Sequence, residues 1–443
     1  MDIVVMAGQI QLMATGPQEE FFTLDPDYSH FIESFKRHSN FSREYVDIDS
    51  ENGADFGKKV RFKIPQNQGD ILKTISVRCT LPEILTSTTM YIESVAHALI
   101  EHVELIIGGK VIQRITSDYL QIYSEHNVTQ TKQKGLEQLI GKYPLRTTDK
   151  KVGEVISGGG GNTGIIIHDT LGLDTDETFF IDIPFYFYNH PELAIPLCAI
   201  TKQEVEVEFK LRDVQDLVIK GDGTYITLNE TLKIKEFQLC TELVFIDCEE
   251  RIKFQKMKRD YLITQIQQNI FDVDAGVNTG KFKLDFDNPV KELYFVIQRQ
   301  GTTGDGVSQG NFVTIFDYDN TASVEGGKFI LYENLDHLTL TLDGQEIITR
   351  DTGNVIFLKA VQGAIHHSKT QLIRRFYSYS FALQPEEWYP TGQVNFSLVK
   401  EQLVNLSLTN CPDFKRQVRI YALSYNTLRI REGIAETLFD SKQ

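Results

Sequence analysis

Apolar and polar residues alternate along much of this chain of 443 residues. Every second residue is apolar in 60–64, 205–211, 282–286, 338–342 and 404–408. Successive side chains of a β-strand point to opposite faces of its sheet. The alternation therefore predicts strands that have one face on a core and the other in water.

Helical periodicity is confined to short stretches, of which 116–127, 135–140 and 353–366 are the clearest. Turn residues such as Gly108-Gly109 and Asp343-Gly344 separate the predicted strands. The 28 Phe and 18 Tyr also suit sheets, because aromatic side chains pack well on a pleated surface. These features predict an all-β chain with short helices in its loops, as in sandwiches and barrels.

The strand pattern occurs twice. Residues 103–112 and 338–347 both contain an apolar strand, a two-residue turn that ends in Gly109 or Gly344, and a second strand. The strands at 60–64, 72–77, 205–211 and 237–243 recur in the same order at 282–286, 290–297, 404–408 and 418–424. The spacing between counterparts shortens along the chain. Because loops tolerate insertions better than strands, we interpret this as two copies of one fold with different loops.

We divide the chain into an N-terminal arm at residues 1–25, a first copy at 26–252 and a second at 253–443. A charged run at 249–260 follows the closing strand of the first copy. This linker is short and is not rich in Gly or Ser, so we expect the copies to be held rigidly. The strand count in each half matches a jelly roll of eight strands in two sheets. The predicted fold is therefore two tandem eight-stranded jelly rolls.

The formal net charge of −16 disfavours extensive binding of nucleic acid, which requires many Lys and Arg. The five cysteines include no Cys-x-x-Cys pair, so neither a disulfide framework nor a zinc site is expected. They favour a reducing compartment. The N-terminal residues are too short and too acidic for a signal peptide, and no apolar run is long enough to span a membrane.

No motif that carries chemistry is complete. The Gly-rich stretch 158–164 lacks the Gly-Lys-Ser/Thr ending of a phosphate loop, and the acidic stretch 174–177 lacks the spacing of a calcium loop. His366-His367 has no further pair of ligands at the spacing of a zinc site. We therefore assign no catalytic, cofactor-binding or metal-binding residue and expect a protein that is not an enzyme.

Several segments resemble the major capsid proteins of the nucleo-cytoplasmic large DNA viruses, which include iridoviruses, phycodnaviruses and marseilleviruses. The resemblance covers nearly the whole chain and is most specific near its ends. The matching segments are 8–16, 35–41, 104–109, 183–187, 247–254 and 421–430.

This resemblance implies a structural protein of the virion that assembles in the host cytoplasm. Three copies would form a homotrimeric capsomer of pseudo-hexagonal outline, and capsomers would tile an icosahedral shell around a double-stranded DNA genome. The implied partners are neighbouring capsomers and minor capsid and penton proteins, without direct contact to nucleic acid and without a cofactor.

The resemblance also assigns positions to individual residues. It places Gly158 and Gly161, and likewise Gly304 and Gly306, in loops on the outer face of the shell. A second group would lie near the inner face, toward minor capsid proteins or the internal viral membrane; it consists of Lys36, Arg37 and His38.

Two other classes remain open. A carbohydrate-binding or carbohydrate-active protein with two β-sandwich modules is compatible with the all-β pattern and with Trp388, which could stack on a sugar or pack a bend. The unpaired cysteines and the lack of a candidate acid pair argue against it. A minor capsid or penton-like relative would share the structural role and differ in abundance.

Overall fold

The computed structural model describes residues 7–33, 35–82, 89–92, 94–141, 177–220, 232–299, 315–316, 318, 322–325, 328–331, 333–369, 376–409 and 415–441. The chain forms two compact units, Met1–Asn40 and Phe41–Gln443. The first contains two short helices, α1 (Ala7–Met13) and α2 (Pro17–Thr23), neither of which has a buried residue. No helix in the described ranges is long and apolar enough to cross a membrane.

The second unit begins with a sandwich of two four-stranded antiparallel sheets. One has the order β1 (Phe41–Ile48), β10 (Glu236–Ile246), β3 (Ile71–Leu81) and β7 (Glu177–Asp182). The other has the order β2 (Lys59–Lys63), β8 (Val205–Leu211), β5 (Ile100–Ile107) and β6 (Lys110–Thr116). The connections contain α3 (Val95–Leu99), α4 (Ser117–Asn127), α5 (Gln130–Ile140) and the paired strands β4 (Thr89–Tyr91) and β9 (Val218–Lys220).

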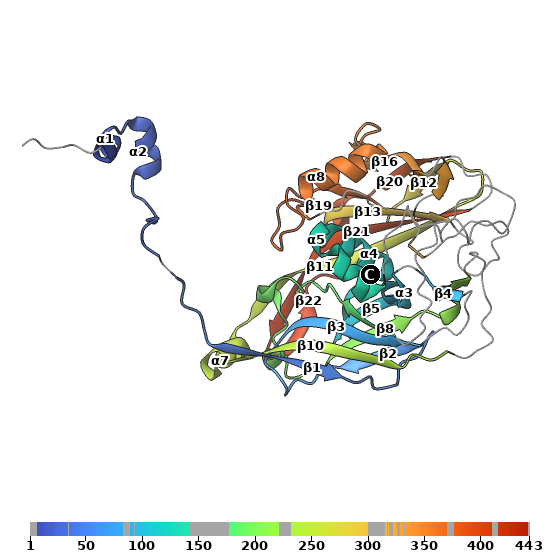
Figure 1. The fold of residues 1–443 in the computed structure, drawn as a ribbon, viewed down its shortest axis with the longest axis horizontal. Coiled ribbons are helices and arrows are strands. Elements are labelled where there is room, and N and C mark those ends of the chain that lie inside the picture. Colours follow the sequence, from blue (N-terminus) through green and yellow to red (C-terminus); the bar gives the residue numbers. More distant parts are fainter. Residues whose placement is uncertain are drawn as a thin grey trace, which may run out of the picture. The chain divides into compact units, whose positions relative to one another are not determined.

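A helix, α7 (Cys248–Lys256), leads into a second sandwich (Figure 1). Its first sheet has the order β11 (Arg259–Val273), β21 (Arg416–Arg431), β13 (Pro289–Arg299) and β18 (Tyr377–Ser380), to which β19 (Val394–Asn395) and β22 (Ile434–Thr437) add. Its second has the order β12 (Thr279–Lys283), β20 (Gln402–Leu408), β16 (Leu335–Leu342) and β17 (Gln345–Ile348). The other elements of this half include β14 (Ala322–Glu325), β15 (Lys328–Leu331), a π-helical turn (Phe357–Val361), α8 (Gln362–His366) and a 3-10 turn (Phe396–Leu398).

The two sandwiches share one topology. The order β1-β10-β3-β7 corresponds to β11-β21-β13-β18, and β2-β8-β5-β6 corresponds to β12-β20-β16-β17. Each set of eight strands is a jelly roll, so the predicted double jelly roll is confirmed. The helices predicted at 116–127, 135–140 and 353–366 are also present, whereas the helix in the charged run, α7, was not predicted.

The duplicated glycine turns are equivalent hairpins. Gly108 and Gly109 have φ of 58° and 79°, and Asp343 and Gly344 have φ of 47° and 80°. Positive φ at both central residues defines a type I′ turn, whose twist matches that of paired strands. In both hairpins the register shifts at the third residue before the turn, at Leu105 and at Leu340. The two copies therefore share a bulge as well as a turn.

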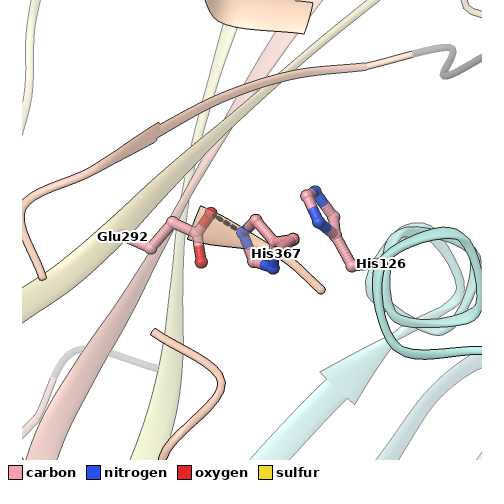
Figure 2. Close-up of side chains that lie close together, drawn as sticks. All are labelled: His126, Glu292 and His367. Atoms are coloured by element: carbon pink, nitrogen blue, oxygen red, sulfur yellow. Dashed lines mark hydrogen bonds and ion pairs between the residues drawn. The ribbon is translucent and has the colours of Figure 1, made fainter. Parts of the chain in front are cut away.

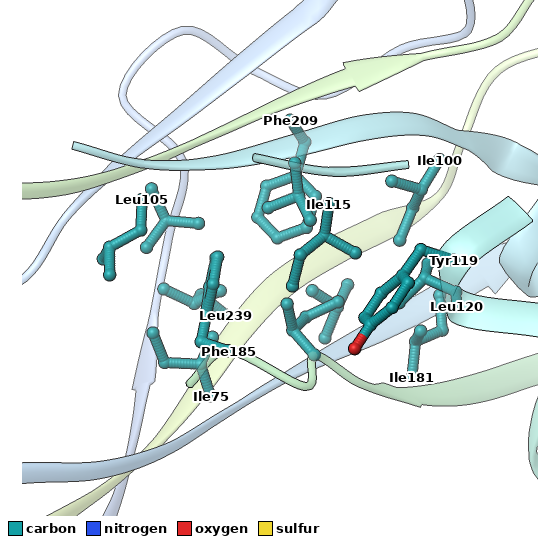
Figure 3. Packing of buried hydrophobic residues seen from close by; sticks show 14 of the residues in the cluster. Ile75, Ile100, Leu105, Ile115, Tyr119, Leu120, Ile181, Phe185, Phe209 and Leu239 are labelled. Atoms are coloured by element: carbon teal, nitrogen blue, oxygen red, sulfur yellow. The ribbon is translucent and has the colours of Figure 1, made fainter. Parts of the chain in front are cut away.

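The first sandwich is filled by apolar side chains from both of its sheets (Figure 3). Ile75, Leu239 and Ile181 come from one sheet, and Leu105 and Phe209 from the other, and all five are fully buried. This is the burial that the alternating pattern predicted. Burying a large apolar side chain contributes about 1.5–3 kcal/mol, so these residues dominate the stability of the sandwich.

The β11-β21-β13 sheet is buried on both faces. Phe295 and Ile420 point into the core of the second sandwich, whereas Tyr294, Val296 and Tyr421 belong to the core cluster that also fills the first. Strands that are buried on both faces lose the polar alternation and become continuously apolar. In the middle of β21, seven consecutive residues are buried, and the run is apolar except for Ser424 and Asn426, which form hydrogen bonds.

Candidate functional site

The two sandwiches meet along the outer face of the β11-β21-β13 sheet, against which α4 packs (Figure 1). Gln265 of β11 donates a hydrogen bond of 2.6 Å to the carbonyl oxygen of Ile112 in β6. The β21–β22 hairpin also contacts the first sandwich, because the backbone N–H of Ala435 donates to Gln203. Phe41–Gln443 consequently forms one compact unit.

Helix α4 contributes several buried polar and charged side chains to this interface. Its first turn is capped by Thr116, whose hydroxyl accepts a hydrogen bond from the backbone N–H of Tyr119. Nine of its 11 residues are buried, and they include Asp118, Glu125 and His126. Buried charges are costly unless they are paired. The partners of these residues therefore decide how the sandwiches are joined.

Asp118 is paired with the second sandwich. Its carboxylate lies 2.7 Å from Nε of Arg419 on β21, and it also accepts hydrogen bonds from the hydroxyls of Tyr318 and Tyr421. Burial and the Asp118 charge raise the pKa of both tyrosines, which keeps them protonated as donors. Burial by itself would lower the pKa of Arg419, but the adjacent carboxylate outweighs this and raises it. The network is a buried, charged connection between the two copies.

A second polar cluster lies at the other end of α4 (Figure 2). It joins His126 of α4 to Glu292 of β13 and to His367, which directly follows α8, and all three side chains are buried. His367 Nε2 lies 2.8 Å from Glu292 Oε1, and the His126 and His367 ring centroids are 3.9 Å apart. Burial raises the pKa of Glu292, but His367 and the hydroxyl of Tyr294 outweigh this and lower it. Glu292 is therefore held as a carboxylate.

No spacing motif in the sequence links His367 to other possible metal ligands, but the fold places two such side chains beside it. One ligand atom from each of His126, Glu292 and His367 lies within 4.8 Å of the others. The three residues are far apart in sequence, so no spacing motif could have found them. The pairing of β13 with β21 and the packing of α4 bring them together.

The basic residues assigned to an inner face lie in the first unit. Lys36, Arg37 and His38 lie outside helices and strands and have exposed side chains, and His38 Nδ1 lies 2.7 Å from the carbonyl oxygen of Ser39. Large apolar side chains of this unit are also exposed. They include Phe21, Phe22, Leu24, Phe31 and Phe35. This unit therefore offers both charge and apolar surface for contact.

The other predicted positions differ in what the structure describes. Gly158, Gly161, Gly304 and Gly306 lie outside the described residues. Trp388 is partly exposed and packs edge-to-face with Tyr389, with ring centroids 5.8 Å apart.

Two family models match consecutive parts of the chain. Residues 29–247 match the family described as major capsid protein N-terminus, and residues 250–436 match the large eukaryotic DNA virus major capsid protein. The chain is 28% identical over 442 residues to the major capsid protein of Pyramimonas orientalis virus, with 96% of this chain and 98% of that protein covered. It is 24% identical over 474 residues to that of Paramecium bursaria Chlorella virus 1, with 97% and 98% covered.

Solved structures show the same fold. The capsid protein VP54 of PBCV-1, fitted into a reconstruction of the virophage Sputnik, matches with a TM-score of 0.72 at 20% identity, covering 93% of this chain and 100% of that one. The Faustovirus major capsid protein matches with a TM-score of 0.69 at 15% identity, covering 91% and 93%.

Proposed function

Because this chain belongs to the major capsid proteins of large eukaryotic DNA viruses, we propose that three copies of it form a homotrimeric capsomer. Each chain contributes two jelly rolls, so a trimer presents six similar sandwiches around its axis. Such a trimer has a pseudo-hexagonal outline and fits six-fold positions of an icosahedral shell. Rings of this kind close through heterologous contacts between identical subunits.

The observation that carries this proposal is the repeated topology within one compact unit. Both sandwiches have the same strand order, and the buried Asp118–Arg419 pair connects them. A capsomer requires this rigidity, because its neighbours contact both sandwiches at fixed positions. The two family models meet between residues 247 and 250, which supports the division into jelly rolls at 26–252 and 253–443.

The proposal extends to the surfaces of the capsomer. Residues 1–25 form an arm, and Lys36, Arg37 and His38 face the inside of the shell, where minor capsid and penton proteins and the internal membrane lie. Gly158 and Gly161 of the first jelly roll, and Gly304 and Gly306 of the second, lie in outward loops. The charge of −16 supports a shell that does not contact the genome directly.

The role is structural, and we place assembly in the host cytoplasm. Cys79, Cys198, Cys240 and Cys248 are free thiols, which supports a reducing environment. The relatives reported above are capsid proteins, and this supports a function without catalysis or a cofactor.

Size-exclusion chromatography with light scattering tests the trimer. We expect the full chain to elute at three times its monomer mass at micromolar concentration. A stable monomer across the accessible concentration range would contradict the proposal. Negative-stain images of the same fraction should show particles of pseudo-hexagonal outline, which a dimer or tetramer cannot give.

A further inference from the structure

The interface between the sandwiches contains a buried cluster of three side chains of the types that bind metal ions. His126 belongs to the first sandwich, and Glu292 and His367 belong to the second. All three are at least nine-tenths buried. Two imidazoles and a carboxylate are a ligand set that zinc favours.

The three candidate ligand atoms already lie near one another. Zinc binds nitrogen and oxygen ligands at about 2.0–2.2 Å, so two ligand atoms of a tetrahedral site stand about 3.3 Å apart. The His367 Nε2–Glu292 Oε1 distance is 2.8 Å, and all three ligand atoms lie within 4.8 Å of one another. Figure 2 shows His367 between Glu292 and the ring of His126. A change of about half an ångström at the first pair and of up to about 1.5 Å at the widest pair would create the metal geometry.

The surrounding groups suit a metal site. The hydroxyl of Tyr294 donates to Oε2 of Glu292 at 2.8 Å, which leaves Oε1 to face His367. On the other side of the His367 ring, Nδ1 is buried without a hydrogen-bond partner, and Oε1 of Glu386 lies 3.9 Å away. Ser368 holds that carboxylate through its backbone N–H and its hydroxyl. Metal-bound histidines usually donate their second N–H to such a carboxylate, which fixes the tautomer.

We propose that His126, Glu292 and His367 bind a zinc ion that fastens the two jelly rolls to each other. His367 ligates through Nε2, and Glu386 receives its Nδ1–H. The three protein ligands leave one position for a water molecule or for the second oxygen of Glu292. The ion bridges α4 of the first sandwich and β13 of the second, so its binding stabilises their contact. This inference does not depend on how the capsomer assembles.

The test uses the full chain, expressed with zinc and purified without chelator. Elemental analysis by mass spectrometry should find about one zinc per chain. The variants H126Q and H367Q should lose it, whereas H366Q serves as the matched control, because His366 is adjacent in sequence and outside the cluster. Wild type and H366Q should unfold at a lower temperature after denaturation and refolding in EDTA than after refolding with zinc chloride.

Wild-type protein that contains no zinc and unfolds at the same temperature after refolding with or without zinc would overturn the proposal. The three residues would then form only a buried ion pair. If H126Q or H367Q fails to fold, the wild-type protein is instead refolded with cobalt in place of zinc. A visible d–d spectrum of tetrahedral cobalt supports the site, and its absence overturns it. Light scattering on the same samples measures the oligomeric state, so a failure of the trimer proposal can be told apart from a failure of the zinc proposal.

Discussion

Arg419 of the second jelly roll lies 2.7 Å from the Asp118 carboxylate of the first, and both side chains are almost completely buried. The two residues are 301 positions apart in sequence, and Arg419 also donates a hydrogen bond of 3.3 Å to Oδ1 of Asp118. Their pairing makes the contact between the jelly rolls specific, because an unpaired charge at this place would remain out of water.

Replacing Asp118 by Asn should strongly destabilise the protein. Arg419 would stay buried without its carboxylate, and breaking a buried pair in this way costs about 3–5 kcal/mol. Denaturant unfolding of D118N measures the loss. The control is D260N, which removes the partner of Arg429 from a more exposed pair. There we expect a much smaller loss. Equal losses in the two variants would show that the buried pair has no special role.

The two hairpin glycines should respond equally to substitution. An added Cβ at Gly109 or Gly344 meets no atom within 4 Å, so only the positive φ opposes it. We expect G109A and G344A each to lose about 1–2 kcal/mol of unfolding free energy. Gly135, exposed in α5 with equally free space, is the control, and G135A should gain about 0.5–1 kcal/mol. A gain in all three variants would argue against the type I′ turns.

Acid should weaken the sheet pairing between β2 and β8 through Glu208. Burial raises the pKa of this carboxyl, but hydrogen bonds from Lys59 and Arg61 outweigh burial and lower it below its ordinary value of 4.5. Its contribution is thus present above pH 4.5 and is lost as the pH falls through the lowered pKa. E208Q should be less stable by about 1 kcal/mol at pH 7, since both basic partners are half-exposed. The difference from wild type should shrink as the pH falls below 4.5 and disappear once Glu208 is protonated in the folded protein; a difference that persists there would have another cause.

Lys36 should be protected in intact particles. If the basic residues Lys36, Arg37 and His38 face the inside of the shell, a membrane-impermeant amine reagent should label Lys36 only after the particles are opened. Peptide mass spectrometry measures the labelling, and free trimers give the fully exposed reference. Rapid labelling of Lys36 in intact particles would place this segment outside.

Epitope insertions test whether the proposed outward loops are exposed on intact particles. A short tag after Gly161 or after Gly306 should leave the trimer intact and bind antibody on whole particles. The same tag after Gly8, in the arm, should become accessible only after disruption. Accessibility of the arm tag together with protection of the loop tags would reverse the assigned orientation.

Local sequence patterns were sufficient for most strands. The alternation at 205–211 and 404–408 predicts β8 and β20, because a strand with one face in water must alternate. The glycine turns were also readable, since few residues other than glycine adopt positive φ without strain. Helix α7 was missed because its residues are mainly charged and none is buried, so it has no apolar face to signal a helix.

The candidate zinc cluster and the Asp118–Arg419 pair could not be read from the sequence. His126, Glu292 and His367 have no common spacing, and only the packing of α4 on β13 and β21 places them together. The sequence by itself determined the strand period, the turns and the duplication, because these depend on neighbouring residues. The tertiary structure alone decided that β21 is buried on both faces and which charged residues meet there, because those contacts depend on chain segments that are distant in sequence.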